Sequence, residues 1–92
     1  MVTGTYIILN RSGFHARPAG LFVKTASRFR SVIKVVNGKQ SADGKSILAL
    51  MLLGATPGAE ITIEAQGEDE AEALNALAEL ITARFGEERG PV

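Results

Sequence analysis

Cysteine is absent from this 92-residue sequence, and histidine occurs once. Without cysteine neither a disulfide framework nor a thiolate metal site can form, and the chain suits a reducing compartment. A single histidine leaves too few ligands for an ordinary zinc site. We therefore predict a protein without metal and without cofactor.

Charge of one sign is not in excess, since ten Lys and Arg balance ten Asp and Glu. This argues against nucleic-acid binding, which depends on surplus cations. Long apolar runs are also missing. The longest, residues 47–53, is well below the roughly 20 residues that cross a bilayer, and no basic segment precedes an apolar stretch as in a secretory signal. We expect a cytoplasmic protein with no membrane insertion.

The composition that is present, 46% hydrophobic and 22% charged residues, is typical of a globular chain. We predict one domain over residues 1–92 and a monomer, with an ordered core over about residues 3–85. Residues 86–92 are predicted to form a C-terminal tail, frayed over its charged and small residues Glu87, Glu88, Arg89, Gly90 and Pro91.

The first half of the chain predicts a strand at residues 5–9 and a helix that begins near His15, with Pro18 tolerated in its first turn. Strands follow at residues 32–36 and 39–42, and Asn37-Gly38 favours a tight hairpin with two positive φ angles between them.

In the second half, Ser46 is expected to cap a short helix that ends at Gly54. Residues 60–65 alternate as a half-buried strand does. Asp69 with Glu72 resembles a capping box, and the final helix is expected to reach Phe85. The order β-α-β-β-α-β-α predicts an α+β domain of two layers, with helices on one face of an antiparallel sheet.

His15 stands where a loop becomes a helix, in the segment Gly13 to Ala19. Unpaired backbone N–H groups and the helix dipole make such a junction attractive to phosphate. Arg17 adds a cation with donors spaced for phosphate oxygens. A neutral imidazole is a nucleophile, and imidazole titrates close to physiological pH. The residues alone leave a solvated capping histidine as the alternative; no G-x-S-x-G elbow indicates a serine hydrolase.

Two surfaces adjoin this segment in the predicted structure. Arg17, Lys24 and Arg28 form a basic stripe on the first helix, with Gly20 and Leu21 between them, which would attract an acidic protein. The short helix is apolar all round, so Leu50 and Leu53 are expected inside. The rest would form an exposed docking cluster, unless deeper burial or dimerisation covers it: Ile47, Leu48, Met51 and Leu52.

Two motifs resemble those of HPr, the histidine-containing phosphocarrier family of the bacterial phosphoenolpyruvate:sugar phosphotransferase system. Gly13 to Ala19 is similar to its phosphohistidine motif and Lys45 to Gly54 to its regulatory-serine motif, and the resemblance spans about residues 3–85. It implies an open-faced β-sandwich, in which a four-stranded antiparallel sheet is covered on one face by three helices.

The resemblance also implies a carrier role, not an enzyme in the strict sense. His15 would be phosphorylated at Nδ1 by enzyme I, with Arg17 stabilising the phosphate, and would pass the group to EIIA domains for sugar uptake. Ser46 would be the site of an HPr kinase/phosphorylase in lineages that have one. The expected docking residues are Ala16, Gly20, Leu21, Lys24, Lys45, Ile47, Leu48, Met51 and Leu52.

Two residues depart from the family pattern. Phe14 replaces a small aliphatic residue and is expected to reshape the docking rim, and Gly20 loosens the first helix. The sequence fits a nitrogen-branch carrier as well as a sugar-branch one. A regulatory module controlled by Ser46, with His15 unused, and a small RNA-binding α/β domain are further alternatives.

Overall fold

The structure is a computed structural model that describes residues 1–90. Its elements are β1 (Val2–Ile7), α1 (Ala16–Ala26), β2 (Val32–Asn37), β3 (Gln40–Asp43), α2 (Ile47–Leu52), β4 (Glu60–Gln66) and α3 (Glu70–Thr82), followed by a 3₁₀ turn, η1 (Arg84–Gly86). The predicted order of strands and helices is confirmed, and the observed bounds differ from the predicted ones by a few residues.

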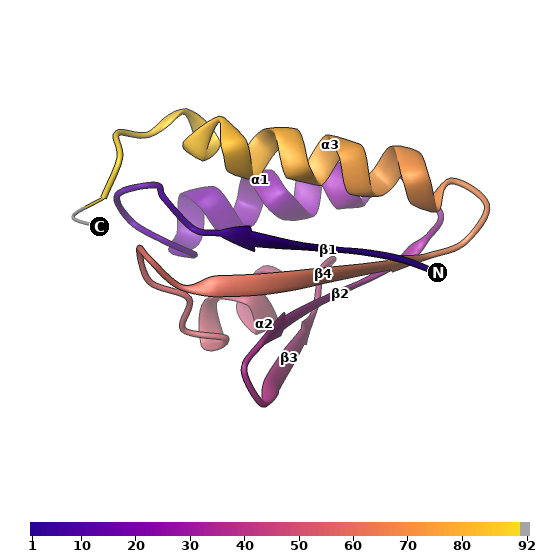
Figure 1. The fold of residues 1–92 in the computed structure, drawn as a ribbon, viewed down its shortest axis with the longest axis horizontal. Helices are drawn as coiled ribbons and strands as arrows, with labels where there is room; N and C mark the ends of the chain where they lie inside the picture. Colours follow the sequence, from indigo (N-terminus) through magenta and orange to yellow (C-terminus); the bar gives the residue numbers. More distant parts are fainter. Residues whose placement is uncertain (91–92) are drawn as a thin grey trace.

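The four strands form one antiparallel sheet in the order β1-β4-β2-β3. Figure 1 shows α1 and α3 lying beside each other over the sheet, and α2 contacts both α1 and β3. Strand β4 alternates as predicted, with Ile61, Ile63 and Ala65 buried and the ends of the strand exposed. The predicted α+β fold is therefore confirmed.

The hydrophobic core lies between the sheet and the helices. Phe22 of α1, Leu50 of α2, Ile63 of β4 and Leu77 of α3 have no exposed surface. Removing a side chain of this size from water contributes roughly 1.5–3 kcal/mol. This burial fixes the helices on the sheet and thereby sets where the first turn of α1 lies.

The uncovered face of the sheet combines polar side chains with two exposed apolar ones, Ile7 and Val32. Thr5 and Thr62 share a hydrogen bond of 3.1 Å across β1 and β4, and Lys34 is paired with Glu64 across β2 and β4. Tyr6 is half-buried against the core, so its ring is not offered for base stacking as the RNA-binding alternative required. Within residues 1–90, no helix combines the length and apolarity that a bilayer crossing needs.

The predicted tight hairpin between β2 and β3 is confirmed, but its centre is Gly38-Lys39 and not Asn37-Gly38, because Asn37 pairs with Gln40; Gly38 has φ +63°, and Asn37 does not have a positive φ. The capping box predicted for α3 is wrong. Asp69 stands at the start of α3 but makes no capping hydrogen bond. Its carboxylate instead accepts hydrogen bonds from Ser31, a tertiary partner that competes with the expected capping box.

The prediction of a frayed C-terminus is also wrong for residues 87–90, whereas Pro91 lies outside the described residues. The N–H of Gly90 donates to the carbonyl of Leu9 at 2.7 Å, and Arg89 bridges Asn10. We call residues 87–90 the C-terminal strap. The strap pairs with the loop after β1, so its backbone groups have hydrogen-bond partners. The prediction considered only the charged and small side chains of this segment and missed these distant partners.

Candidate functional site

The loop that precedes α1 is held against the chain after α2. Gly13 has φ +62°, and a Cβ atom at this position would lie 2.4 Å from the carbonyl oxygen of Ala55. The N–H of Phe14 donates to that same oxygen at 3.0 Å. Only glycine combines this backbone conformation with so close an approach, so Gly13 determines how the chain reaches the helix.

Phe14 is buried, so the prediction that it reshapes the docking rim is wrong. Its ring makes edge contacts with Phe22 of α1 at 5.5 Å and with Phe85 of η1 at 5.8 Å between centroids. These contacts remove the ring from water and favour edge-to-face geometry. Phe14 therefore anchors the residue next to His15 in the core.

His15 is the N-cap residue of α1, as predicted, and its side chain is exposed. Its backbone is extended, and its carbonyl accepts the N–H of Ala19 at 2.9 Å. Within residues 1–90 its imidazole makes no capping hydrogen bond. The ring is thus accessible, and it lies where the first N–H groups of a helix lack intrahelical partners.

Arg17 lies in the first turn of α1, and its side chain is 63% exposed. Its Nη1 atom is 3.4 Å from Oε2 of Glu87 and 3.5 Å from the carbonyl oxygen of Phe85. Both contacts are long for charge-assisted hydrogen bonds. The guanidinium is therefore held at the helix start by weak contacts and can move to a stronger anionic partner.

Glu87 belongs to this site although its sequence context did not indicate it. Its carboxylate accepts hydrogen bonds from Asn10 and Ser12 and is paired with Arg17. Partial burial opposes ionisation of Glu87, but these hydrogen bonds and the Arg17 charge together lower its pKa. Asn10 and Glu87, the two ends of this network, are 77 residues apart in the chain, so no local pattern could have revealed it.

Ser46 is the N-cap of α2, as predicted, and its hydroxyl accepts the N–H of Ala49 at 3.2 Å. Leu50 and Leu53 are buried, as predicted. The remaining large side chains of α2 are 40–73% exposed and form what we call the α2 patch: Ile47, Leu48, Met51 and Leu52. An exposed apolar cluster of this kind is typical of a docking surface.

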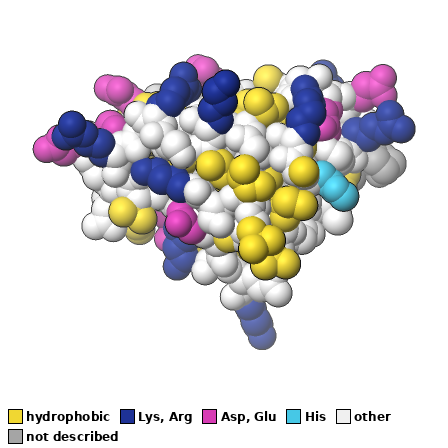
Figure 2. Space-filling model, turned by 180° about the vertical axis from the view of Figure 1, so that it is seen from behind, with side chains coloured by type: hydrophobic (Ala, Val, Ile, Leu, Met, Phe, Trp, Pro, Cys, Tyr) yellow, Lys and Arg dark blue, Asp and Glu magenta, His cyan; other side chains and the backbone are white. Residues whose placement is uncertain are grey.

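The other predicted docking residues lie on α1 and just before α2, and they differ in exposure. Ala16 and Lys24 are exposed, and Gly20 and Leu21 are half-buried. Lys45 is half-buried, and its ammonium donates to the carbonyl of Phe29 at 2.8 Å, so it links the turn after α1 to the start of α2. Figure 2 shows the histidine at the edge of a group of hydrophobic side chains, with Lys and Arg side chains nearby.

The described part of the chain, residues 1–90, contains no group of three His, Asp or Glu side chains placed to bind a metal ion. The arrangement around His15 joins an exposed imidazole, a helix N-terminus and a weakly held guanidinium. A helix N-terminus and a guanidinium are groups that favour binding of phosphate oxygens.

Comparison with known proteins agrees with this geometry. The family model described as the PTS HPr component phosphorylation site matches residues 2–83. The phosphocarrier protein HPr of Treponema pallidum is 43% identical over 88 residues, covering 96% of this chain and all of that protein. The phosphocarrier protein HPr of Neisseria meningitidis serogroup A is 46% identical over 80 residues, covering 87% and 90%.

Solved structures of relatives share the fold. HPr from Thermoanaerobacter tengcongensis superposes with a TM-score of 0.92 at 46% identity, over 96% of this chain and 99% of that one. Crh of Bacillus subtilis, described as a swapped dimer, has a TM-score of 0.74 at 40% identity, over 91% and 97%.

Proposed function

The chain belongs to the HPr family of phosphocarrier proteins of the phosphotransferase system, and from this premise we propose that His15 receives a phosphoryl group from enzyme I and passes it to EIIA domains for sugar uptake. The observation that carries the proposal is the exposed imidazole of His15 at the start of α1, two residues before an exposed and weakly held arginine in the first turn. A nitrogen-branch carrier would use the same residues with a different donor.

The transfer needs one nucleophile and one charge partner. The neutral imidazole attacks the phosphorus through Nδ1, the atom that the family resemblance implies. An N–P bond forms while the bond from phosphorus to the donor atom of enzyme I breaks, and the electron pair of that bond stays with the donor. Arg17 and the N–H groups at the start of α1 stabilise the oxygens of the phosphoryl group. The reverse displacement delivers the group to the acceptor protein.

Docking is proposed to use the α2 patch together with the basic residues of α1. Apolar side chains supply the contact area, and Lys24 and Arg28 steer a partner whose surface is acidic. Enzyme I and EIIA would approach the same face, because both must reach His15. Met51 suits such shared use, since its flexible side chain adapts to different partners.

Ser46 is proposed as a regulatory phosphorylation site in a host with HPr kinase/phosphorylase. A phosphate there adds about two negative charges beside the α2 patch, which would repel an acidic partner. We expect Ser46→Asp to weaken binding to enzyme I several-fold while the fold is kept, because Asp is also a good N-cap residue. Calorimetric titration with enzyme I measures this; equal affinity of Ser46→Asp and wild type would contradict the regulatory role.

We propose that the unmodified protein is a monomer, although some relatives are described as dimers. An exposed α2 patch is required for docking, and a dimer formed through it would cover the approach to His15. Light scattering after gel filtration should give the mass of one chain. The mass of two chains for the unmodified protein would overturn this assignment.

Intact-mass measurement tests the carrier function directly. The protein is incubated with phosphoenolpyruvate and enzyme I, beside a His15→Ala variant. One acid-labile phosphoryl group is expected on the wild type and none on the variant. If sugar-branch enzyme I adds nothing and a nitrogen-branch donor does, the carrier belongs to that branch. Failure with both donors would favour the regulatory module in which His15 is unused.

A further inference from the structure

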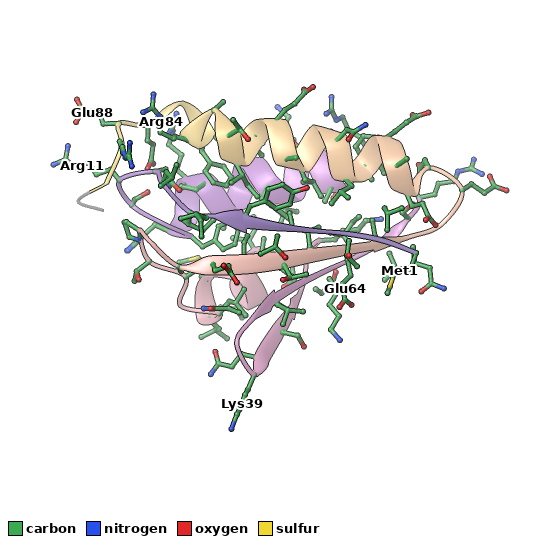
Figure 3. All side chains as sticks on the ribbon, viewed as in Figure 1. Met1, Arg11, Lys39, Glu64, Arg84 and Glu88 are labelled. Atoms are coloured by element: carbon green, nitrogen blue, oxygen red, sulfur yellow. The ribbon has the colours of Figure 1, made fainter. Side chains whose placement is uncertain are left out.

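The C-terminal strap is fastened to the loop that carries the chain from β1 to His15. The N–H of Arg11 donates to the carbonyl of Glu88, and the N–H of Gly90 donates to the carbonyl of Leu9, both at 2.7 Å. Figure 3 shows the side chains of Arg11 and Glu88 together at one end of the molecule, with Met1 at the other end. The strap therefore adds a strand-like pairing next to the functional site.

Glu87 is the residue of the strap that turns inward, and its side chain is 16% exposed. One oxygen, Oε1, accepts three hydrogen bonds: from Asn10 Nδ2 at 3.0 Å, from the N–H of Ser12 at 3.0 Å and from the hydroxyl of Ser12 at 2.7 Å. Asn10 Nδ2 also donates to the carbonyl of Gly13 at 2.9 Å. The carboxylate is thus connected to the peptide unit that precedes Phe14 and His15.

The other carboxylate oxygen has a different partner. Oε2 faces Nη1 of Arg17 at 3.4 Å and the hydroxyl of Ser12 at 2.8 Å. Oε1 therefore contacts only the loop, whereas Oε2 contacts both the loop and the guanidinium of Arg17. The ionised form of Glu87 makes these contacts with the loop and with Arg17. Partial burial opposes ionisation, but the hydrogen bonds and the Arg17 charge together lower the pKa of Glu87.

The backbone that brings Glu87 to this position is unfavourable on its own. Arg84 and Phe85 have φ values of +57° and +52°, and Gly86 has φ +76°. Side-chain-bearing residues adopt this left-handed conformation where surrounding structure holds them there, often at functional sites. Here the holding contacts are the buried ring of Phe85 against Phe14 and the hydrogen bonds of Glu87.

We propose that Glu87 is a positioning residue for phosphoryl transfer, which fixes the loop before His15 through Asn10 and Ser12 and keeps Arg17 beside the helix start. This inference rests on the proposed function of His15. Glu87 does not touch the reacting atoms. Its effect is to hold the imidazole and the guanidinium in a geometry from which the transfer can begin, and small misplacements of reacting groups cost large factors in rate.

Two substitutions of Glu87 separate its contacts. Glu87→Gln keeps an oxygen for the Asn10 and Ser12 hydrogen bonds and replaces the oxygen toward Arg17 with an amide. Glu87→Ala removes both sets. Glu88→Ala is the matched control, because Glu88 lies on the same strap, is 84% exposed and pairs with Arg11 at 3.7 Å.

The experiment measures phosphoryl transfer from enzyme I under steady-state conditions, at a temperature where circular dichroism shows each variant folded. We expect Glu87→Ala to lower kcat about ten-fold or more with KM nearly unchanged, because the α2 patch is untouched. Glu87→Gln should give a kcat between those of Glu87→Ala and wild type, because it keeps the loop contacts and loses the charge that faces Arg17, and Glu88→Ala should match wild type. A residue that contributes stability alone would leave kcat of the folded variants unchanged.

Ser12→Ala supplies a second measurement that does not depend on Glu87→Ala folding. It removes the shortest of the three hydrogen bonds to Oε1 and should lower kcat by a smaller factor. In the double variant the two effects should not multiply, because Ser12 acts through Glu87. Independent effects, or an unchanged kcat in Ser12→Ala and Glu87→Ala, would overturn the inference alone. A wild-type protein that accepts no phosphoryl group would overturn the proposed function as well.

Discussion

At the scale of the residue, the position of Gly13 accepts only glycine, because any Cβ atom there would collide with the backbone. It combines φ +62° with a backbone contact that would place a Cβ 2.4 Å from the carbonyl oxygen of Ala55. We expect Gly13→Ala to destabilise the protein by roughly 1–3 kcal/mol and to slow phosphorylation of His15, because the loop must shift. Urea unfolding and the transfer assay measure the two effects.

Gly38 provides the matched control for this substitution. Its φ of +63° is nearly the same, but a Cβ atom there meets no atom within 4 Å, and it lies in the β2–β3 turn. Gly38→Ala should therefore show the cost of the backbone conformation without the collision and without loss of transfer. Equal losses of transfer in both variants would show that crowding at Gly13 is not the cause.

At the scale of the element, α1 contains a glycine that its packing does not require. Gly20 has no positive φ, and a Cβ atom at this position meets nothing within 4 Å. Glycine inside a helix is less stable than alanine by roughly 0.5–1 kcal/mol. We therefore expect Gly20→Ala to raise the free energy of unfolding by about that amount, as measured in urea.

The control for Gly20 lies just after α2. Gly54 has equally open surroundings but a φ of +71°, a conformation that disfavours alanine. Gly54→Ala should lower stability while Gly20→Ala raises it. The same sign in both variants would mean that the backbone conformation does not decide the outcome.

At the scale of the whole molecule, several carboxylates have pKa values lowered by hydrogen bonds in the folded state. The Ser31 hydroxyl and the Arg30 N–H lower the pKa of Asp69, and the Gly67 N–H lowers that of Glu70. When the pH lies between the pKa of the folded state and the higher pKa of the unfolded state, such a group binds more protons in the unfolded chain. Their contribution to stability is therefore complete above the unfolded pKa and is lost as pH falls through the folded one.

We accordingly expect the free energy of unfolding to be flat near neutral pH and to decrease as pH falls below about 4.5. Urea unfolding of wild type and Asp69→Asn across pH 7 to pH 3 tests this. The difference between the two proteins should shrink in acid, because the wild-type carboxylate becomes protonated. A difference that stays constant to the lowest pH would contradict the assignment to Asp69.

Local patterns were sufficient to predict the order of the elements and the position of His15 at a helix start. The alternation of Ile61, Ile63 and Ala65 identifies β4, and Ser46 marks the start of α2 because a cap and the apolar run after it are neighbours in sequence. His15 at a helix start was predicted on the same basis. These features depend on contacts within a few residues, which sequence order alone supplies.

The support around the site was decided by the tertiary structure. The carboxylate of Asp69 accepts a hydrogen bond from Ser31 and does not cap α3. The ring of Phe14 is buried against Phe85. Glu87, which was predicted to lie in a frayed tail, accepts hydrogen bonds from the loop before His15. Each outcome joins residues far apart in the chain, where hydrogen bonds and ring contacts form only after the sheet and helices have brought them together. The sequence by itself determined the fold class and the place of His15 at the start of a helix; the packing of the two chain ends determined how the loop before that histidine is held.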